Sequence, residues 1–264
     1  MHDSTNGTII LGGGYFDREN SAALLKRVTE LAGGPGVSLV VIPTADTQLE
    51  PATRAGSSTT LIDYEKAARL DFARLGVQKV TVLHTRDRTV ADSEKFAEPL
   101  RSANCVWIPG GDPQLLFGLY PNTRVQRELQ GVLGRGGVIA GDSAGAEIIG
   151  QGLLAVDLGH PETMPTVQMG GLGLLRNAFV MAHVNRYRAS VVEIGSETFV
   201  SGHPGAICVL IAEHTAIMIH QDHVSRLIGS GKAGVVDGRR HGTDSVVWLS
   251  GSDRFDLRTP ASVH

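Results

Sequence analysis

The chain has 264 residues, of which 42% are hydrophobic and 19% are charged, and its formal net charge is −3. These values are ordinary for a globular protein with a buried core, and they give no electrostatic reason to expect a nucleic acid or an anionic membrane as partner. The longest apolar runs, such as VSLVVI and ICVLIA, are far too short to span a bilayer.

The first half of the chain alternates short β-branched runs with helical patterns. We expect strands at residues 8–14, 37–45, 77–85, 104–112 and 137–146, the last running into a turn and a helix, and helices at residues 20–34, 59–76, 90–103 and 123–137. Because these strands are continuously apolar rather than alternating, they indicate a parallel sheet with helices on both faces.

The second half is richer in strand patterns and has short connections. Strand-like runs cover residues 177–184, 205–221, 224–231, 233–237 and 244–250. Turn glycines between them suggest hairpins at the far side of the same sheet. The sequence therefore predicts an α/β fold with a mostly parallel sheet and a β-rich C-terminal third. No linker, repeat or block of charge divides the chain, so we expect a single domain over residues 1–264.

The cysteines and the start of the chain bear on location. Cys105 and Cys208 both lie in apolar runs and do not make a disulfide framework, so we expect buried thiols in a reducing compartment. The first ten residues show no basic stretch followed by an apolar one. We therefore expect a cytoplasmic protein without a secretion signal.

The 33 glycines gather at the ends of apolar runs. Four glycine-rich or turn-rich strand exits result: GGGYF, PTADT, PGGDPQ and GDSAGA. In open parallel sheets, ligands bind at the carboxyl ends of strands. These four exits are therefore the expected borders of a binding site.

The stretch IAGDSAGA places Ser143 between Gly141 and Gly145. A nucleophile on a sharp strand-to-helix turn needs small neighbours of this kind, although a tight turn with a buried hydroxyl has the same requirement. In the first interpretation the Ala144 amide lies at a helix N-terminus and can stabilise an oxyanion, and the exit PGGD offers a second donor at Gly111 or Asp112.

A serine hydroxyl needs a base, and His183 is the best candidate of ten histidines. It ends the run FVMAHV and precedes NRYR, a helix start with Arg186 and Arg188. A structural histidine is the alternative. Glu213, inside the apolar run VLIAEHTAIMI, is the candidate to orient the imidazole, because a carboxylate is costly to bury without a partner. The alternative is that Glu213 points outward from a half-exposed strand.

These pieces together resemble the S51 serine peptidases, the family of cyanophycinase and the aspartyl dipeptidase (peptidase E) group. The elbow GDSAGA, the exit PGGDPQLL, the segment HVNRYR, the segment AEHTA and the continuation LIGSGKAGVVD are similar to that family's motifs, in the same order. The cyanophycinase branch fits best because AEHTA and IGSG match it. The resemblance implies a class I glutamine-amidotransferase-like α/β fold and a homodimer.

Carried over to this sequence, the resemblance implies that Ser143 is the nucleophile, His183 the general base and Glu213 the carboxylate that holds the imidazole. It implies an oxyanion hole made of the Gly111 and Ala144 amides. The residues expected to contact substrate are Asp112, Gln114, Asp142, Asn185, Arg186 and Arg188. For the two arginines, a solvated helix face is the alternative.

Three departures from cyanophycinase bear on the substrate. Pro113 follows Asp112 where that enzyme has Gln, Met181 and Ala182 replace an Asp-Gln pair before the histidine, and Asp142 replaces Thr or Ser. An arginine side chain is best recognised by a carboxylate fork, so these changes argue against cyanophycin as substrate. Asp142 either binds a substrate ammonium or points away from the site.

The sequence thus predicts a serine hydrolase that cleaves an amide bond in a small peptide, plausibly aspartyl- or β-aspartyl-linked, through an acyl-enzyme. A non-catalytic relative that binds a small peptide or a partner, and a biosynthetic amidohydrolase on the same scaffold, are the alternatives. No cofactor or metal is expected, because neither H-E-x-x-H nor C-x-x-C occurs.

Overall fold

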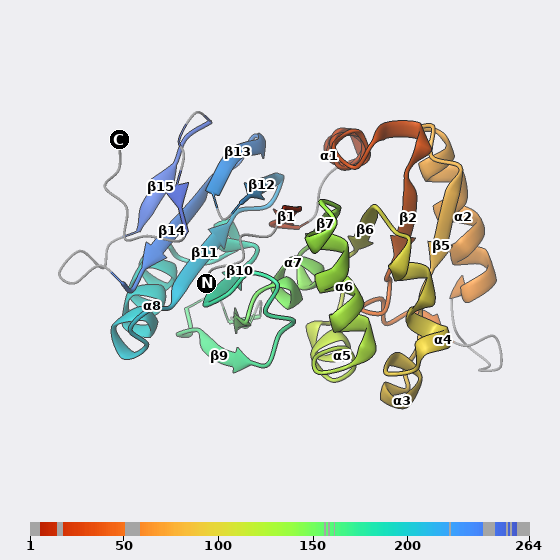
Figure 1. Cartoon of the computed structure of the whole chain (residues 1–264). Helices are drawn as coiled ribbons and strands as arrows, with labels where there is room; N and C mark the ends of the chain where they lie inside the picture. The colour runs from red at the N-terminus through yellow and green to blue at the C-terminus, as the bar shows by residue number, and fades with distance from the viewer. Residues whose placement is uncertain are drawn as a thin grey trace.

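The computed structural model describes residues 6–14, 18–50, 59–155, 157, 159–160, 162–221, 223–239, 246–251, 253 and 255–257. Over these residues the chain forms two main β-sheets, one beside the other, with helices packed around them (Figure 1). The α/β class predicted from the sequence is therefore confirmed, with mixed rather than purely parallel sheets.

The first sheet has eight strands. In spatial order these are β16 (Phe255–Asp256), β13 (His223–Gly229), β12 (Thr215–His220), β1 (Thr8–Gly12), β7 (Val138–Asp142), β6 (Cys105–Ile108), β2 (Ser38–Val41) and β5 (Lys79–Val82). The neighbouring strands β1, β7, β6, β2 and β5 pair in parallel. On the other side of β1, the strands β12, β13 and β16 extend the sheet by antiparallel pairing. The carboxyl ends of β1, β7, β6 and β2 consequently lie along one edge.

The second sheet has six strands. In spatial order these are β15 (Val247–Leu249), β14 (Ala233–Asp237), β11 (Ile207–Ile211), β10 (Ala178–Met181), β8 (Gly152–Ala155) and β9 (Thr166–Met169). The strands β8, β10 and β11 are parallel, and the other three pair antiparallel. A separate short pair joins β3 (Leu49–Glu50) to β4 (Thr59–Thr60).

The expectation of C-terminal hairpins at the far side of one sheet holds for β12 and β13 but is wrong for β14 and β15, which belong to the second sheet. The run 205–221 breaks between β11 and β12, where His214 adopts a left-handed backbone with φ of 57°. The chain crosses there from the second sheet to the first, so β11 and β14 stay in one sheet while β12 and β13 join the other. Glu213 lies in this turn rather than inside a strand.

Helices cover both faces of the first sheet, as predicted. Their bounds are α1 (Arg18–Leu31), α2 (Leu61–Ala73), α3 (Arg88–Ala91), α4 (Glu94–Ala97), α5 (Pro113–Phe117), α6 (Arg124–Gly134), α7 (Ala144–Ile149) and α8 (Ala189–Gly202), with 3-10 turns η1 (Gly34–Gly36), η2 (Glu98–Arg101) and η3 (Val184–Arg186). α1 and α2 pack on one face through Leu24, Val28 and Phe72. α5, α6 and α7 pack on the other, and α8 covers the outer face of the second sheet.

The helix expected at residues 90–103 is broken into α3, α4 and η2. Ser93 interrupts it because its side chain accepts a hydrogen bond from the Phe96 amide and so begins α4 afresh. Pro99 then directs the chain into a 3-10 turn, since proline has no amide hydrogen to continue an α-helix. The sequence analysis also did not predict α5, β8 or β9. It expected a helix to start at residues 185–188, where the structure has η3, followed by α8 from Ala189.

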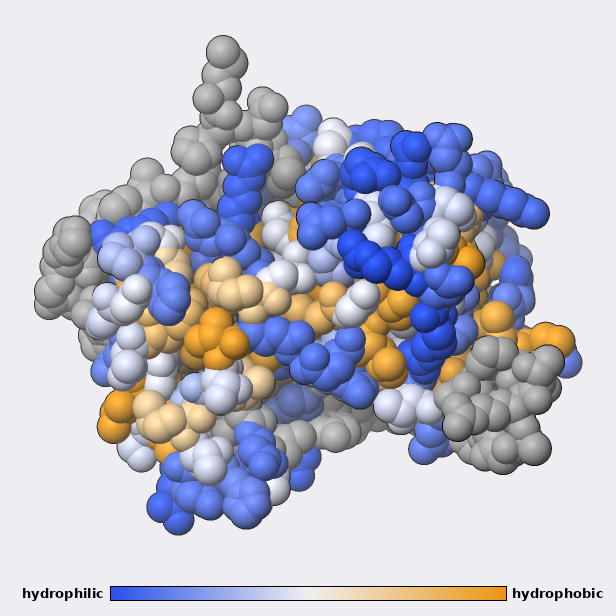
Figure 2. All heavy atoms as spheres, turned by 90° about the horizontal axis from the view of Figure 1, so that it is seen from below, coloured by the Kyte–Doolittle hydropathy of each residue, from blue (hydrophilic) through white to orange (hydrophobic). Residues whose placement is uncertain are grey.

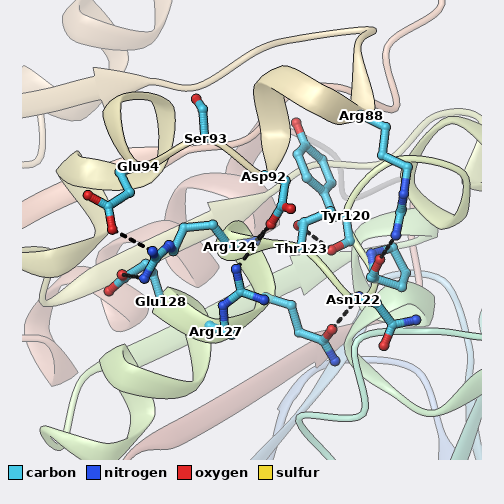
Figure 3. A network of polar contacts seen from close by, with 12 residues as sticks. Arg88, Asp92, Ser93, Glu94, Tyr120, Asn122, Thr123, Arg124, Arg127 and Glu128 are labelled. Carbon is cyan, nitrogen blue, oxygen red and sulfur yellow. Dashed lines mark hydrogen bonds and ion pairs between the residues drawn. The ribbon is translucent and has the colours of Figure 1, made fainter.

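A polar network fixes the start of α6 (Figure 3). Thr123 makes no capping bond to this helix, and its hydroxyl instead donates to the Tyr120 carbonyl at 2.6 Å. Asp92, which follows α3, supplies the missing acceptor for the Arg124 amide at 2.7 Å and also pairs with Arg127 at 3.1 Å. A helix start depends on such acceptors, so Asp92 ties α3 to α6.

The lower side of the molecule carries exposed apolar side chains. β9 is an edge strand at this side, and Met164, Val167 and Met169 in and before it are between 40% and 54% exposed. Figure 2 shows apolar residues lying among polar ones on this face. Within the described ranges, no helix is both long and apolar enough to cross a bilayer.

Both cysteines are buried and unpaired, as predicted. Cys105 lies in β6 of the first sheet and Cys208 in β11 of the second. Burial raises the pKa of the Cys105 thiol to about 12 and also raises the pKa of Cys208. Neither side chain is therefore a reactive thiolate near neutral pH.

Candidate active site

Ser143 stands on a sharp turn between β7 and α7. Its backbone has φ of 52° and ψ of −122°, a strained conformation for a residue with a side chain. Its amide donates to the Gly12 carbonyl at 3.0 Å, which fixes it to the end of β1. The turn needs glycine nearby, since a Cβ added to Gly145 would lie 1.8 Å from the Ile108 carbonyl oxygen. The pattern G-x-S-x-G thus reflects close approach of backbone to backbone.

Ser143 is joined to His183 and Glu213 by two hydrogen bonds. The Ser143 Oγ lies 2.8 Å from His183 Nε2, and His183 Nδ1 lies 3.0 Å from Glu213 Oε1. Ser143 comes from the end of β7, His183 follows β10 and Glu213 follows β11. The site therefore spans both sheets. The His183 and Glu213 side chains are only 9% and 13% exposed.

The environment of His183 favours the neutral imidazole. Burial lowers its pKa below the usual histidine value, and the hydrogen bond and charge of Glu213 oppose that shift only in part. The Arg186 charge lowers the pKa further. A histidine in this state can accept a proton at neutral pH while its other nitrogen is held by a carboxylate.

Glu213 is held by the segment that follows His183. The Glu213 amide donates to Asn185 Oδ1 at 2.7 Å, and Arg186 Nη1 lies 3.5 Å from Glu213 Oε1. Both residues belong to η3, directly after His183. The structure thus brings Asn185 and Arg186, expected to contact substrate, to the Glu213 side of the site. Arg188 precedes α8 and is exposed.

The exit after β6 lies against Ser143. A Cβ added to Gly110 would come within 2.9 Å of the Ser143 Cβ. The Asp112 amide donates to the Ala45 carbonyl at 2.8 Å, so it is already engaged. Gly111 therefore remains as the candidate donor from this exit, and Ala144 is the first residue of α7, where an amide has no partner within its helix.

Two further candidates, Asp112 and Gln114, have partners of their own. The Asp112 carboxylate accepts from the Gln114 amide at 2.9 Å and caps α5. The Gln114 side chain exchanges two hydrogen bonds with Gln168 of β9, at 2.7 and 3.1 Å. Gln168 had no signal in the sequence, because nothing in the pattern pairs residues that lie so far apart in the chain.

Two carboxyl groups beside the candidate triad have raised pKa values. Burial raises the pKa of Asp142 to about 6, although the Gly14 and Ser143 amides favour its charged form, and Asp142 Oδ1 has no hydrogen-bond partner among the described residues. Burial raises the pKa of Glu147 on α7 to about 7, opposed by a 3.5 Å contact from the Ala182 amide. The sequence analysis missed Glu147, which lies one helical turn beyond Ser143.

Across the described ranges, no three His, Cys, Asp or Glu side chains converge where a metal ion could sit. The polar groups around Ser143 form a hydrogen-bonded series of hydroxyl, imidazole and carboxylate. Such an arrangement suits acyl transfer.

Comparison with known proteins decides the family. The family model described as peptidase family S51 matches residues 8–227. The chain belongs to peptidase family S51. The predicted resemblance is thereby confirmed, and with it a serine-type peptidase.

Cyanophycinases are among the relatives to which this chain is similar. That of Geminocystis herdmanii is 27% identical over 243 residues, which cover 90% of this chain and 84% of that protein. That of Trichormus variabilis is 27% identical over 238 residues, covering 89% and 74%. The similarity extends along nearly the whole chain rather than over one motif.

Two solved structures share the fold. A crystal structure of a peptidase from an acI-B1 actinobacterium has a TM-score of 0.69 at 23% identity, covering 95% of this chain and 96% of that one. A putative peptidase E from Listeria monocytogenes has a TM-score of 0.51 at 18% identity, covering 85% and 98%. These likenesses support the α/β architecture described above.

Proposed function

We propose that this S51 peptidase cleaves an amide bond in a small peptide by a Ser143–His183–Glu213 triad and an acyl-enzyme. One observation carries the proposal: two hydrogen bonds, of 2.8 and 3.0 Å, run without interruption from the Ser143 hydroxyl through His183 to Glu213. Because the pKa of His183 is lowered by burial, its Nε2 is unprotonated and ready to receive the Ser143 proton near neutral pH.

In the first half of the reaction, Ser143 Oγ attacks the substrate carbonyl carbon and its proton passes to His183 Nε2. The resulting imidazolium is stabilised by Glu213, and the tetrahedral oxyanion accepts hydrogen bonds from the Gly111 and Ala144 amides. The C–N bond then breaks, and His183 returns the proton to the leaving amine. In the second half, water takes the place of the amine and releases the acid from Ser143.

The proposed substrate is a small peptide with an aspartyl or β-aspartyl link. Support comes from the relatives, which are cyanophycinases, and from the S51 family itself. Cyanophycin is disfavoured, because Met181 and Ala182, which replace an Asp-Gln pair of that enzyme, are buried and offer no polar side chain to a guanidinium group. Asp142 beside the nucleophile then bears on which dipeptide is accepted.

The Ser143→Ala variant tests the nucleophile. We expect amide hydrolysis to fall by about 10⁴-fold or more, since the remaining groups cannot form the acyl-enzyme. Ser93→Ala is a matched control, because Ser93 also begins a helix, while its hydroxyl bonds to the Val90 carbonyl and the Phe96 amide rather than to a triad residue; Figure 3 shows it near Asp92 and Glu94. Activity that survives in Ser143→Ala would refute the triad.

The substrate is tested with α- and β-aspartyl dipeptides and cyanophycin, read by released amine. We expect cleavage of a dipeptide and little release from cyanophycin. A fluorophosphonate probe separates the enzyme from a non-catalytic binder: stoichiometric labelling that disappears in Ser143→Ala supports the enzyme. Peptide binding without any labelling would support a binding protein on the same fold.

A further inference from the structure

The Thr44–Leu49 segment, which follows β2, supports the loop after β6 that contains Gly111. The Ala45 carbonyl accepts from the Asp112 amide at 2.8 Å. Gly111 packs so closely on the same carbonyl that an added Cβ would lie 2.2 Å from the oxygen, and its φ of +142° suits only glycine. Ala45 and Thr44 are both fully buried. The position of the Gly111 amide therefore depends on the position of Ala45.

Arg86, which follows β5, holds the Thr44–Leu49 segment by hydrogen bonds from its guanidinium group. Its Nη1 donates to the Thr44 carbonyl, and its Nη2 donates to the carbonyls of Asp46 at 2.7 Å and Leu49 at 3.2 Å. The guanidinium group thus engages the carbonyls on either side of Ala45, whose own carbonyl is turned to Asp112. One rigid planar fork fixes three peptide groups, which an ammonium group cannot do equally well.

A second contact holds the same segment. The Thr44 hydroxyl lies 2.6 Å from the Tyr120 hydroxyl in a buried position. This contact fixes the start of the segment, whereas Arg86 spans it from Thr44 to Leu49. The removal of Arg86 would therefore loosen the segment without leaving it detached.

We propose that Arg86 is a positioning residue for the oxyanion hole, which sets the place of the Gly111 amide through the Thr44–Leu49 segment. The inference rests on the proposed function, because it concerns how well that site stabilises the oxyanion. Donors in such a hole must meet the developing charge at about 2.7–3.1 Å, so a small displacement of Gly111 weakens the transition-state interaction and leaves substrate binding nearly intact.

Arg88, two residues after Arg86, provides a matched comparison for the Arg86 variant. Its guanidinium group also donates to two carbonyls, those of Leu119 at 3.0 Å and Pro121 at 2.6 Å (Figure 3). These carbonyls follow α5, whereas Gly111 precedes it. Arg88 thus makes the same kind of bond to a neighbouring segment. It reaches the Thr44–Leu49 segment only indirectly, because the carbonyls that it holds flank Tyr120, whose hydroxyl contacts Thr44.

The test compares Arg86→Gln, Arg86→Lys and Arg88→Gln by melting temperature and by the second-order rate of fluorophosphonate labelling. The phosphonyl oxygen occupies the place of the oxyanion, so this rate reports the hole without knowledge of the substrate. We expect labelling to slow by about 10- to 100-fold in Arg86→Gln and by less in Arg86→Lys. In Arg88→Gln we expect a rate within about 2-fold of the parent at a similar loss of melting temperature.

Two results would overturn the inference. Equal slowing in Arg86→Gln and Arg88→Gln would mean that both act only through stability, and normal labelling of Arg86→Gln would mean that Gly111 does not depend on Arg86. With a dipeptide substrate, the loss must appear in kcat rather than KM. Failure of the parent chain itself to label would instead refute the serine chemistry, so the two failures are distinguishable.

Discussion

The two sides of the candidate site are held by different kinds of contact. Ser143 is fixed by backbone, through its bond to Gly12 and the close approach of Gly145 to Ile108. His183 and Glu213 depend more on side chains, through the imidazole–carboxylate bond and the contact with Asn185. The close backbone packing around Ser143 leaves no room for an added atom, whereas the hydrogen bond between His183 and Glu213 depends on the charge of the two side chains. Damage on the first side should therefore appear as lost folding, and damage on the second as altered protonation.

The largest expected effect is on the Ser143 side. In Gly145→Ala the new methyl group meets the Ile108 carbonyl at 1.8 Å, so β6 and α7 cannot pack as they do. We expect a loss of at least about 3–4 kcal/mol in the free energy of unfolding, or no soluble protein. Gly134→Ala, at the end of α6 with nothing within 4 Å, should be neutral or slightly stabilising. Urea denaturation measures both, and a Gly145→Ala protein of parental stability would contradict the close approach.

The next effect is on the other side, in Glu213→Gln. The fold should persist, but kcat should fall by about 10²- to 10⁴-fold, because the imidazolium loses its carboxylate. Glu213 raises the pKa of His183 against burial, so its neutralisation lowers that pKa further. The acid limb of the kcat/KM profile should therefore move to lower pH.

A matched control for that variant exists on the surface. His160 and Glu162 form a similar imidazole–carboxylate pair at 3.4 Å, with both side chains more than half exposed. Glu162→Gln should leave kcat and its pH profile unchanged. A pH profile that stays in place in Glu213→Gln would show that Glu213 does not tune His183.

The smallest effect concerns Glu147, behind the nucleophile. Its pKa of about 7 lies above the usual glutamate value, so the folded chain keeps a proton that the unfolded chain releases above about pH 4.3. The free energy of unfolding therefore falls as pH rises from about 4.3 to about 7. Glu147→Gln should remove this loss, so the free energy of unfolding should rise at pH 8, with no gain at pH 4.

Melting curves at the two pH values check this expectation. Glu98→Gln, an exposed residue at the start of η2, serves as the control and should change little at either pH. A gain in Glu147→Gln that is equal at pH 4 and pH 8 would mean that the carboxyl is not the cause.

The sequence predicted the turn around Ser143 better than it predicted the second sheet. Small residues around Ser143 have one physical cause, the close packing of β7 and β6 against α7, and this cause is visible in eight consecutive letters. His183 was found by its position at the end of an apolar run, and Glu213 by its position inside one, where a carboxylate needs a partner. The structure brings both to Ser143, while their chemical roles stay predictions.

Pairings between distant segments could not be predicted. The run 205–221 is apolar on both sides of Glu213, so the pattern hides the turn that sends β11 and β12 into different sheets. The bonds from Gln114 to Gln168 and from Arg86 to Thr44 join residues that hydropathy periods do not relate. Asn185 was noticed beside His183, but its bond to the Glu213 amide depends on the same unseen turn.

The two cysteines give each sheet a chemical reporter of its own. Cys105 lies in the interior of one sheet and Cys208 in that of the other, and both thiols are shielded from solvent. A thiol reagent can modify either one only when the strand around it opens. The order in which the two are modified would therefore reveal whether the sheets open together or one at a time, without any foreign label in the chain.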